Sequence, residues 1–425
     1  MSQTSDTQPF ERWESNVRSY SRAFPAVFSR AKNAEVWDEQ GRKWIDFFSG
    51  AGTLNYGHNP PSIQKKLVEY ISSDGIVHAL DSYTVAKREF LARFGKDVLE
   101  PRGLDFKVQC CGPTGANSVE AALKLVRRVT GRDGVIAFSG AYHGMSLGAA
   151  SITGARSTRR ARGVSVGHTT FVPYPVGPMG EFDSLGLLKH QLEDLSSGVE
   201  LPAAVFIESV QMDGGVYVAP EGFLRELRAL CDKHQVLLVV DDIQAGCGRS
   251  GKFFSFERAG ITPDVVTVSK SIGGMGLPMA LLLMKKAHDV WKPGEHTGTF
   301  RGHQLSFVAA TAALDLWTSA PFQSHLAAMG AKLQGELAAR FRALDPRLEV
   351  RGIGGVLGVD TLKAGGEALA AAVGRACFEQ GLMIERCGRE DTVLKVLPPL
   401  SIPLEQLEAG CTILEGALRK ALRAA

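Results

Sequence analysis

Three stretches that read as β-strands are each followed by residues that could act together in one site. One apolar run ends at Asp241, a second reaches Lys270 after a serine, and a third, 106–110, leads through Gly112-Pro113-Thr114-Gly115 into a helical pattern. Parallel strands end at one edge of their sheet, so we expect a carboxylate, a lysine and a helix N-terminus to meet at that edge.

These three features together suit pyridoxal 5'-phosphate (PLP). The free N–H groups of a helix N-terminus bind phosphate. A lysine amine forms a Schiff base with the cofactor, and a carboxylate pairs with its pyridinium nitrogen. Each feature alone is weak, because strand ends commonly carry a surface lysine, an acidic helix cap or a glycine turn. Their coincidence favours a PLP site.

A rival nucleotide site is weaker. The run 246–252 fits the GxxxxGK part of a phosphate-binding loop and follows an apolar strand. Phe253 stands where a Ser or Thr should hold magnesium, however, and the residues after it do not open a convincing helix. Residues 241–244 also separate the strand from the loop, so we disfavour the NTPase interpretation.

Composition excludes several classes of protein. The chain has 425 residues, 44% of them hydrophobic, which argues against disorder. Its net charge of +3 is too close to zero to predict binding to nucleic acid or a membrane surface. Seven scattered cysteines and the lack of a visible signal peptide predict a cytoplasmic protein, and no histidine or cysteine cluster predicts a metal site. The basic stretch is expected to be a solvated loop rather than a phosphate contact: Arg156, Arg159, Arg160 and Arg162.

Continuous apolar strands that alternate with helices predict an α/β fold with a mostly parallel sheet covered on both faces. Towards the two ends the pattern differs: a hairpin is predicted within 35–57, and glycine-rich strands within 350–359. We therefore expect a large PLP-binding domain (61–320) and a smaller α+β domain built from an N-terminal segment (1–60) and a C-terminal part (321–425).

Several blocks of the chain resemble the class III (omega, or subgroup II) aminotransferases, in the family's order. The resemblance extends from Phe24 to Leu418 and implies PLP-dependent aminotransferase fold type I. The blocks that carry it are 114–120, 142–144, 239–251, 263–270 and 299–302.

Outside these general blocks, further stretches are similar to the diaminobutyrate–2-oxoglutarate transaminases of ectoine biosynthesis. They include Val17-Arg18-Ser19-Tyr20, residues 46–59, 86–91 and 101–105, and Pro293-Gly294-Glu295-His296. This similarity implies transfer of an amine from glutamate to the terminal carbon of aspartate 4-semialdehyde, giving L-2,4-diaminobutyrate and 2-oxoglutarate.

The family resemblance also implies roles for individual residues. Lys270 would bind the cofactor covalently and move the proton, and Asp241 would keep the pyridine nitrogen protonated. Other cofactor contacts would come from Gly115, Ala116, Tyr142, His143, Ile243, Gln244 and Thr299, and substrate contacts from Asn55, Asp213 and Lys395. Thr299 would reach the site of a second subunit, which implies a homodimer or a tetramer.

Two departures from the family's pattern concern the substrate. The usual Gly-Glu pair is replaced by Met212-Asp213, which keeps the charge on a shorter side chain and adds bulk. Lys395 stands where many members have an arginine, and a lysine cannot make the two-pronged contact of a guanidinium. The alternative to a substrate-binding role is that Lys395 is a solvated strand residue.

Three alternatives stay open, the first of them because of Met212-Asp213. One is an omega-aminotransferase that acts on another terminal amine or semialdehyde in secondary metabolism. Another is an aminomutase or racemase on the same fold, which would need no 2-oxoglutarate. The third is the nucleotide-binding protein that would use residues 246–252.

Overall fold

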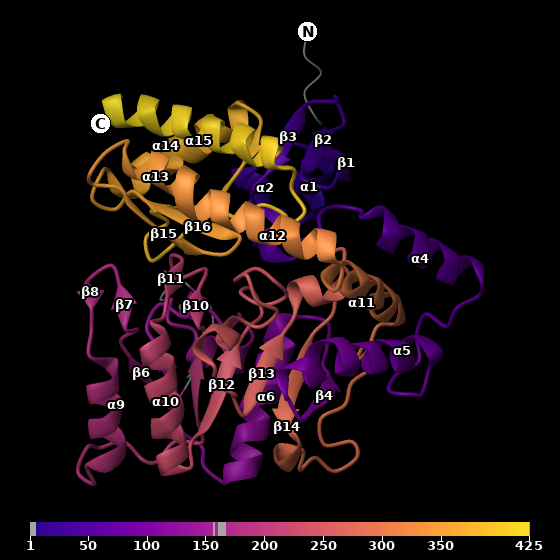
Figure 1. Ribbon diagram of the computed structural model, residues 1–425, viewed down its shortest axis with the longest axis vertical. Helices are drawn as coiled ribbons and strands as arrows, with labels where there is room; N and C mark the ends of the chain where they lie inside the picture. The colour runs from indigo at the N-terminus through magenta and orange to yellow at the C-terminus, as the bar shows by residue number, and fades with distance from the viewer. Residues whose placement is uncertain (1–5, 156–157, 160–166, 425) are drawn as a thin grey trace.

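The computed structural model describes residues 6–155, 158–159 and 167–424. Figure 1 shows two parts, a large one around a central sheet in the lower half and a smaller one above it. Arg156, Arg160 and Arg162 of the basic stretch lie outside the described residues. None of the described helices is long and apolar enough to cross a membrane.

The central sheet has seven strands in the order β4-β14-β13-β12-β9-β5-β6. All run parallel except β14, which is antiparallel to both of its neighbours. The strands are β4 (Phe106–Cys110), β5 (Val135–Phe138), β6 (Thr169–Val172), β9 (Ala204–Ile207), β12 (Leu237–Asp241), β13 (Val265–Val268) and β14 (Leu281–Lys285). The sequence analysis did not predict β14.

Alternate residues of these strands enter two separate hydrophobic clusters, one on each face of the sheet. Val239 and Val265 join Val119 and Val126 of α6 (Gly115–Thr130) on one face. Val240 and Val266 join Leu227 of α10 (Glu221–His234) on the other. Burial on both faces explains why the strands read as continuous apolar runs, and it confirms the predicted mostly parallel sheet.

Further α-helices among the described residues of the large part are α4 (Pro61–Ser72), α5 (Val85–Phe94), α7 (Leu147–Ile152), α9 (Ser184–Glu193) and α11 (Gln304–Trp317). Short pairs of strands stand at its upper edge in Figure 1: β7 (Val176–Gly177) with β8 (Gly180–Glu181), and β10 (Val210–Gln211) with β11 (Tyr217–Val218).

Both ends of the chain build the smaller part, as predicted. β1 (Phe28–Lys32), β2 (Glu35–Asp38) and β3 (Lys43–Asp46) form a sheet that β17 (Leu382–Met383) joins in parallel to β3. A second sheet has the order β15-β16-β19-β18, formed by Glu349–Ile353, Val356–Asp360, Val393–Val396 and Glu385–Cys387. The domain boundaries at residues 60 and 320 stay predictions.

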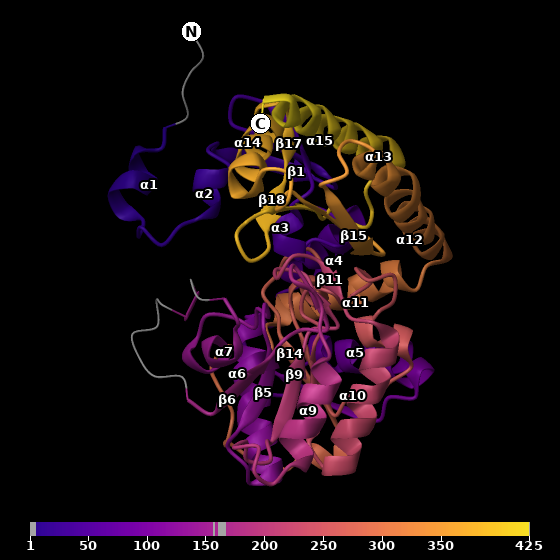
Figure 2. The same cartoon turned by 90° about the vertical axis from the view of Figure 1, so that its left-hand side faces the viewer.

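The helices of this part are α1 (Gln8–Trp13), α2 (Tyr20–Ala23), α3 (Ser49–Gly52), α12 (Ala320–Lys332), α13 (Ala338–Arg342), α14 (Gly366–Glu379) and α15 (Leu404–Ala424). In Figure 2 the N-terminal α2 lies beside α14 and β18, although more than 300 residues separate them in the sequence.

Candidate active site

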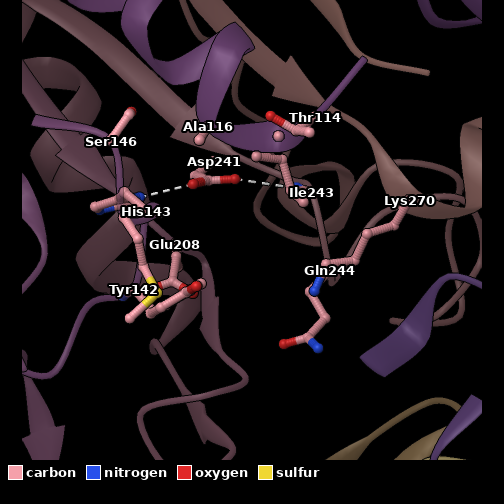
Figure 3. A pocket seen from close by; sticks show the side chains of 13 residues that line it. Thr114, Ala116, Tyr142, His143, Ser146, Glu208, Asp241, Ile243, Gln244 and Lys270 are labelled. Atoms are coloured by element: carbon pink, nitrogen blue, oxygen red, sulfur yellow. Dashed lines mark hydrogen bonds and ion pairs between the residues drawn. The ribbon is translucent and has the colours of Figure 1, made fainter. Parts of the chain in front are cut away.

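A cavity of about 370 Å³ lies where β12 and β13 end and α6 begins (Figure 3). Eight of the predicted cofactor contacts line it: Gly115, Ala116, Tyr142, His143, Asp241, Ile243, Gln244 and Lys270. The fold therefore brings together the residues of the strand-end argument (Asp241, Lys270 and Gly115) and others that the family resemblance implied.

Asp241 is a buried carboxylate, 5% exposed, held in place by two donors. His143 Nδ1 donates to Asp241 Oδ2 at 2.6 Å, and the Ile243 N–H donates to Oδ1 at 3.1 Å. The ring of His143 is itself buried, and its Nε2 has no hydrogen-bond partner among the described residues. This arrangement fixes the orientation of the Asp241 carboxylate at the cavity wall. His143 contributes by holding Asp241 in place.

Lys270 follows β13 in a strained backbone conformation, with a φ of +53° in the left-handed region. Its Nζ donates to the carbonyl oxygen of Ala51 at 3.0 Å, and Gln244 Nε2 donates to the same oxygen at 2.6 Å. Burial, and after it the positive charge of Lys395, lowers the pKa of Lys270. A lowered pKa favours the unprotonated amine, which is the nucleophilic form.

The N-terminus of α6 supplies N–H groups that have no partner within the helix. Thr114 precedes this helix, and its hydroxyl donates to Asn117 Oδ1 at 2.9 Å. A Cβ atom added to Gly115 would lie 2.9 Å from Ile243 Cδ1, so a larger residue would push the end of the Ile243 side chain aside. Glycine therefore keeps the backbone open to an anion such as a phosphate group.

Sequence reasoning missed Glu208, which lines the cavity directly after β9. Its Oε2 accepts the N–H of Tyr142 at 3.0 Å. Burial, and after it the charge of Asp241, raises the pKa of Glu208 well above its ordinary value. The strand-end rule that found Asp241 would also have found Glu208, because residues 203–207 form a continuous apolar run typical of a buried strand.

Thr299, the ninth predicted cofactor contact, lies elsewhere in the single chain. It is exposed on a loop, and its carbonyl oxygen accepts a hydrogen bond from His78 Nε2 at 2.9 Å. With Phe300, Thr299 lines a second hollow of about 100 Å³.

The predicted substrate residues lie outside the lining of the main cavity. Asn55 is buried, and its side chain bonds Cys247 O at 3.0 Å and Arg249 Nη2 at 2.7 Å. Lys395 is fully buried, so the alternative of a solvated strand residue is wrong. Its Nζ lies 3.8 Å from Asp213 Oδ1, so these two predicted residues are neighbours.

Met212 does not add its bulk to the cavity wall. It is 1% exposed and packs with Val210, Val216 and Ala245 in a separate hydrophobic cluster. Of the altered Met212-Asp213 pair, the carboxylate is thus the member that remains partly exposed, with 44% of its side chain accessible.

The glycine-rich run 246–252 is built into the interface with the smaller part. Arg249 is fully buried and donates to Gly355 O at 2.8 Å and Pro398 O at 2.6 Å. The run is followed by the short 3₁₀-helix Ser255–Ala259 and not by an α-helix. It therefore lacks the helix N-terminus on which a phosphate-binding loop depends.

The donor set of the main cavity fits PLP. The cavity combines an amine of lowered pKa at Lys270, a carboxylate of fixed orientation at Asp241 and a helix N-terminus whose N–H groups Gly115 leaves uncovered. Ile243 and Tyr142 stand on opposite sides of the cavity in Figure 3, where a flat ring would lie between them. Among the described residues, no group of three or more His, Cys, Asp or Glu side chains could hold a metal ion.

The sequence profile of aminotransferase class-III proteins matches residues 17–418. A diaminobutyrate–2-oxoglutarate transaminase of Nocardia farcinica is 49% identical, over 98% of this chain and 94% of that protein. A protein of the same name from Oceanobacillus iheyensis is 46% identical, over 98% and 97%. An uncharacterized aminotransferase, y4qG, of Sinorhizobium fredii is 49% identical, over 97% and 92%.

Solved structures give the same picture of the fold. The ornithine aminotransferase of Toxoplasma gondii superposes with a TM-score of 0.84 at 24% identity, over 99% of this chain and 96% of that one. The taurine:2-oxoglutarate aminotransferase of Bifidobacterium kashiwanohense, in complex with PLP and glutamate, has a TM-score of 0.83 at 25% identity, over 94% and 93%. These likenesses confirm the predicted α/β fold.

Proposed function

The chain belongs to the class-III aminotransferases, which depend on PLP, and from that premise we propose its substrates. It transfers an amino group between glutamate and the terminal carbon of aspartate 4-semialdehyde, giving L-2,4-diaminobutyrate and 2-oxoglutarate. The observation that carries this proposal is the near full-length identity to diaminobutyrate–2-oxoglutarate transaminases from different bacteria, 49% and 46% in the two cases above.

The residues of the main cavity have distinct roles in this proposal. Bound PLP supplies an electron sink for the carbon that loses its proton. Lys270 anchors the cofactor through its amine and, when free, moves a proton between carbons, a task that its lowered pKa suits. Asp241 holds a proton on the pyridine nitrogen, with His143 fixing its direction.

Five further residues orient the cofactor. The N–H groups of Gly115 and Ala116 bind its phosphate, Ile243 and Tyr142 cover the two ring faces, and Gln244 reaches the ring hydroxyl. Support comes from the position of these residues around the cavity.

We further propose that the active unit is a homodimer, with Thr299 of each subunit completing the site of the other. The surface around Thr299 supports this. Phe300 is 66% exposed and Leu80 50%, and both line the hollow at Thr299, where a second copy would cover them. The seven cysteines are all free, which suits a reducing compartment, and we propose the cytoplasm.

A second candidate is an omega-aminotransferase that acts on a different terminal amine or semialdehyde. The observation that favours it is Met212-Asp213 in place of the family's usual pair, since Asp213 contacts Lys395 and both were expected to bind substrate. The uncharacterized relative at 49% identity leaves room for such a substrate.

The test uses purified holoenzyme with 2-oxoglutarate as acceptor and a panel of amine donors: L-2,4-diaminobutyrate, ornithine and 4-aminobutyrate. We expect formation of glutamate fastest from diaminobutyrate, and no turnover by Lys270→Ala. Faster turnover of another donor would replace the proposed substrate with that donor. Turnover of diaminobutyrate by Lys270→Ala at the wild-type rate would overturn the role of Lys270.

A further inference from the structure

Another cavity, here called the edge cavity, lies at the side of the central sheet. β4 is the first strand in the order of that sheet, and the cavity is enclosed by β4, α5 and the loop 291–301 (Figure 1). Its volume is about 250 Å³, against about 370 Å³ for the main cavity, and the two share no lining residue. The edge cavity is therefore a separate space with room for a small molecule.

Arg301 gives the clearest indication that this cavity takes a ligand. The residue lines the cavity, and its Nε and Nη1 atoms are buried without a hydrogen-bond partner in residues 6–155, 158–159 and 167–424. A buried guanidinium that has lost its hydration is costly unless acceptors replace the water. A ligand with several oxygen acceptors would supply them.

The charge of the lining favours an anion. Lys87 of α5 and Lys292 line the cavity together with Arg301, and Asp81 is the acidic member of the lining. Burial, and after it the charge of Arg301, lowers the pKa of His296 to about 4, so this lining residue is neutral at neutral pH. Three positive charges then stand against one negative charge, which leaves a net charge of +2 for a ligand to balance.

The neutral groups on β4 add a donor and no anion. Gln109 Oε1 accepts a hydrogen bond from Trp291 Nε1 at 3.0 Å, which leaves the amide N–H groups of Gln109 to donate to a ligand. Burial raises the pKa of Cys110 to about 11, although the charges of Lys87 and Arg301 act in the opposite direction. The Cys110 thiol therefore stays protonated and does not neutralise the nearby cations.

We propose that the edge cavity binds an oxyanion, a phosphate or a carboxylate group, with Arg301 as its main contact and Lys87 and Lys292 beside it. This ligand is additional to the cofactor and the amino acids of the proposed reaction. Arg301 follows Thr299 by two residues, so a bound anion also restrains the loop that carries Thr299.

The test is a calorimetric titration of wild-type holoenzyme, saturated with PLP so that the phosphate site of the cofactor is filled. Inorganic phosphate and succinate are titrated separately, with chloride keeping the ionic strength constant. We expect saturable binding with a Kd below about 1 mM for at least one of them. Tighter binding of phosphate would indicate a phosphate ester as the ligand, and tighter binding of succinate a carboxylic acid.

Arg301→Gln should raise this Kd about tenfold or more, as expected when hydrogen bonds from a charged group are lost. Arg88→Gln is the matched control, because Arg88 is exposed next to Lys87 on α5 and does not line the cavity. It should keep the wild-type Kd. If Arg301→Gln does not yield folded holoenzyme, Lys292→Gln decides: Lys292 is exposed, so the fold should tolerate the change, and the Kd should rise about threefold or more.

An unchanged Kd in the deciding variant would overturn the inference. So would a wild type that shows no saturable binding of either anion up to about 10 mM. If Arg301→Gln then also weakens subunit association in analytical ultracentrifugation, a carboxylate of a second copy occupies the cavity instead. These measurements do not depend on turnover, so failure of the proposed transaminase function would be recognised separately.

Discussion

Replacing Asp241 by asparagine tests the centre of the proposed site, because it removes the charge and keeps the shape. An asparagine oxygen can still accept from the Ile243 N–H, and its amide nitrogen can donate to His143 Nδ1, so the variant should fold. Asp241 is 5% exposed, which makes an effective dielectric constant of about 20 appropriate. A charge pair about 4 Å apart is then worth about 4 kcal/mol, or about a thousandfold in rate.

The assay is the half-reaction with glutamate in single turnover, followed by the loss of absorbance of the bound cofactor. Cofactor content is measured first, so that weaker binding is not mistaken for slower chemistry. Asp241→Glu serves as control: it keeps the charge, loses the fit to His143, and should fall between wild type and Asp241→Asn. A fully loaded Asp241→Asn enzyme that reacts within about tenfold of the wild-type rate would refute the role of Asp241.

Three further predictions concern other parts of the chain. Gly115→Ala should weaken PLP binding about tenfold by pushing Ile243 towards the ring, and Ile243→Val should restore it, as a titration of the apoprotein with PLP would show. Arg249→Met should lower the free energy of unfolding by about 3–5 kcal/mol in urea, because it leaves three buried acceptors unpaired; a loss below about 1 kcal/mol would contradict this. Burial raises the pKa of Asp242 to about 7, against the hydrogen bonds from Ser255 that lower it. A folded-state pKa raised from 3.8 to about 7 gives stability that is fully present below about pH 4 and is lost as the pH rises to about 7, so Asp242→Asn should flatten the fall in unfolding free energy between about pH 4 and pH 7. If the unfolding free energy of Asp242→Asn falls with pH as steeply as that of the wild type, the prediction for Asp242 is refuted.

The large part of the fold could be predicted because its signals are local. A strand buried on both faces must be apolar along its length, and this makes strands such as β12 and β13 visible in the sequence. The position of Lys270 and Asp241 then follows from the rule that functional residues gather at the carboxyl ends of parallel strands. The direction of β14 carries no such signal, because an apolar strand reads the same whether it runs parallel or antiparallel.

The substrate end of the site could not be predicted in the same way. Lys395 is charged and follows two apolar residues, which is also the pattern of a solvated strand. Its burial depends on Glu385, and the register that places them opposite each other is set by a turn of irregular residues between β18 and β19. Asn55 shows the same limit, since its partner Arg249 comes from a loop almost 200 residues away.

The strained backbone at the cavity has a structural consequence for how the two parts of the fold meet. Lys270 and Ala51 both have left-handed φ values, of +53° and +55°, a conformation that costs a non-glycine residue about 1–3 kcal/mol. Such strain persists only where other contacts fix it, and here Lys270 and Gln244 both donate to Ala51 O while Ser271 Oγ donates to Gly52 O at 2.8 Å. Residues 51 and 52, whose carbonyl oxygens hold Lys270 and Ser271, thus come from the N-terminal part of the chain.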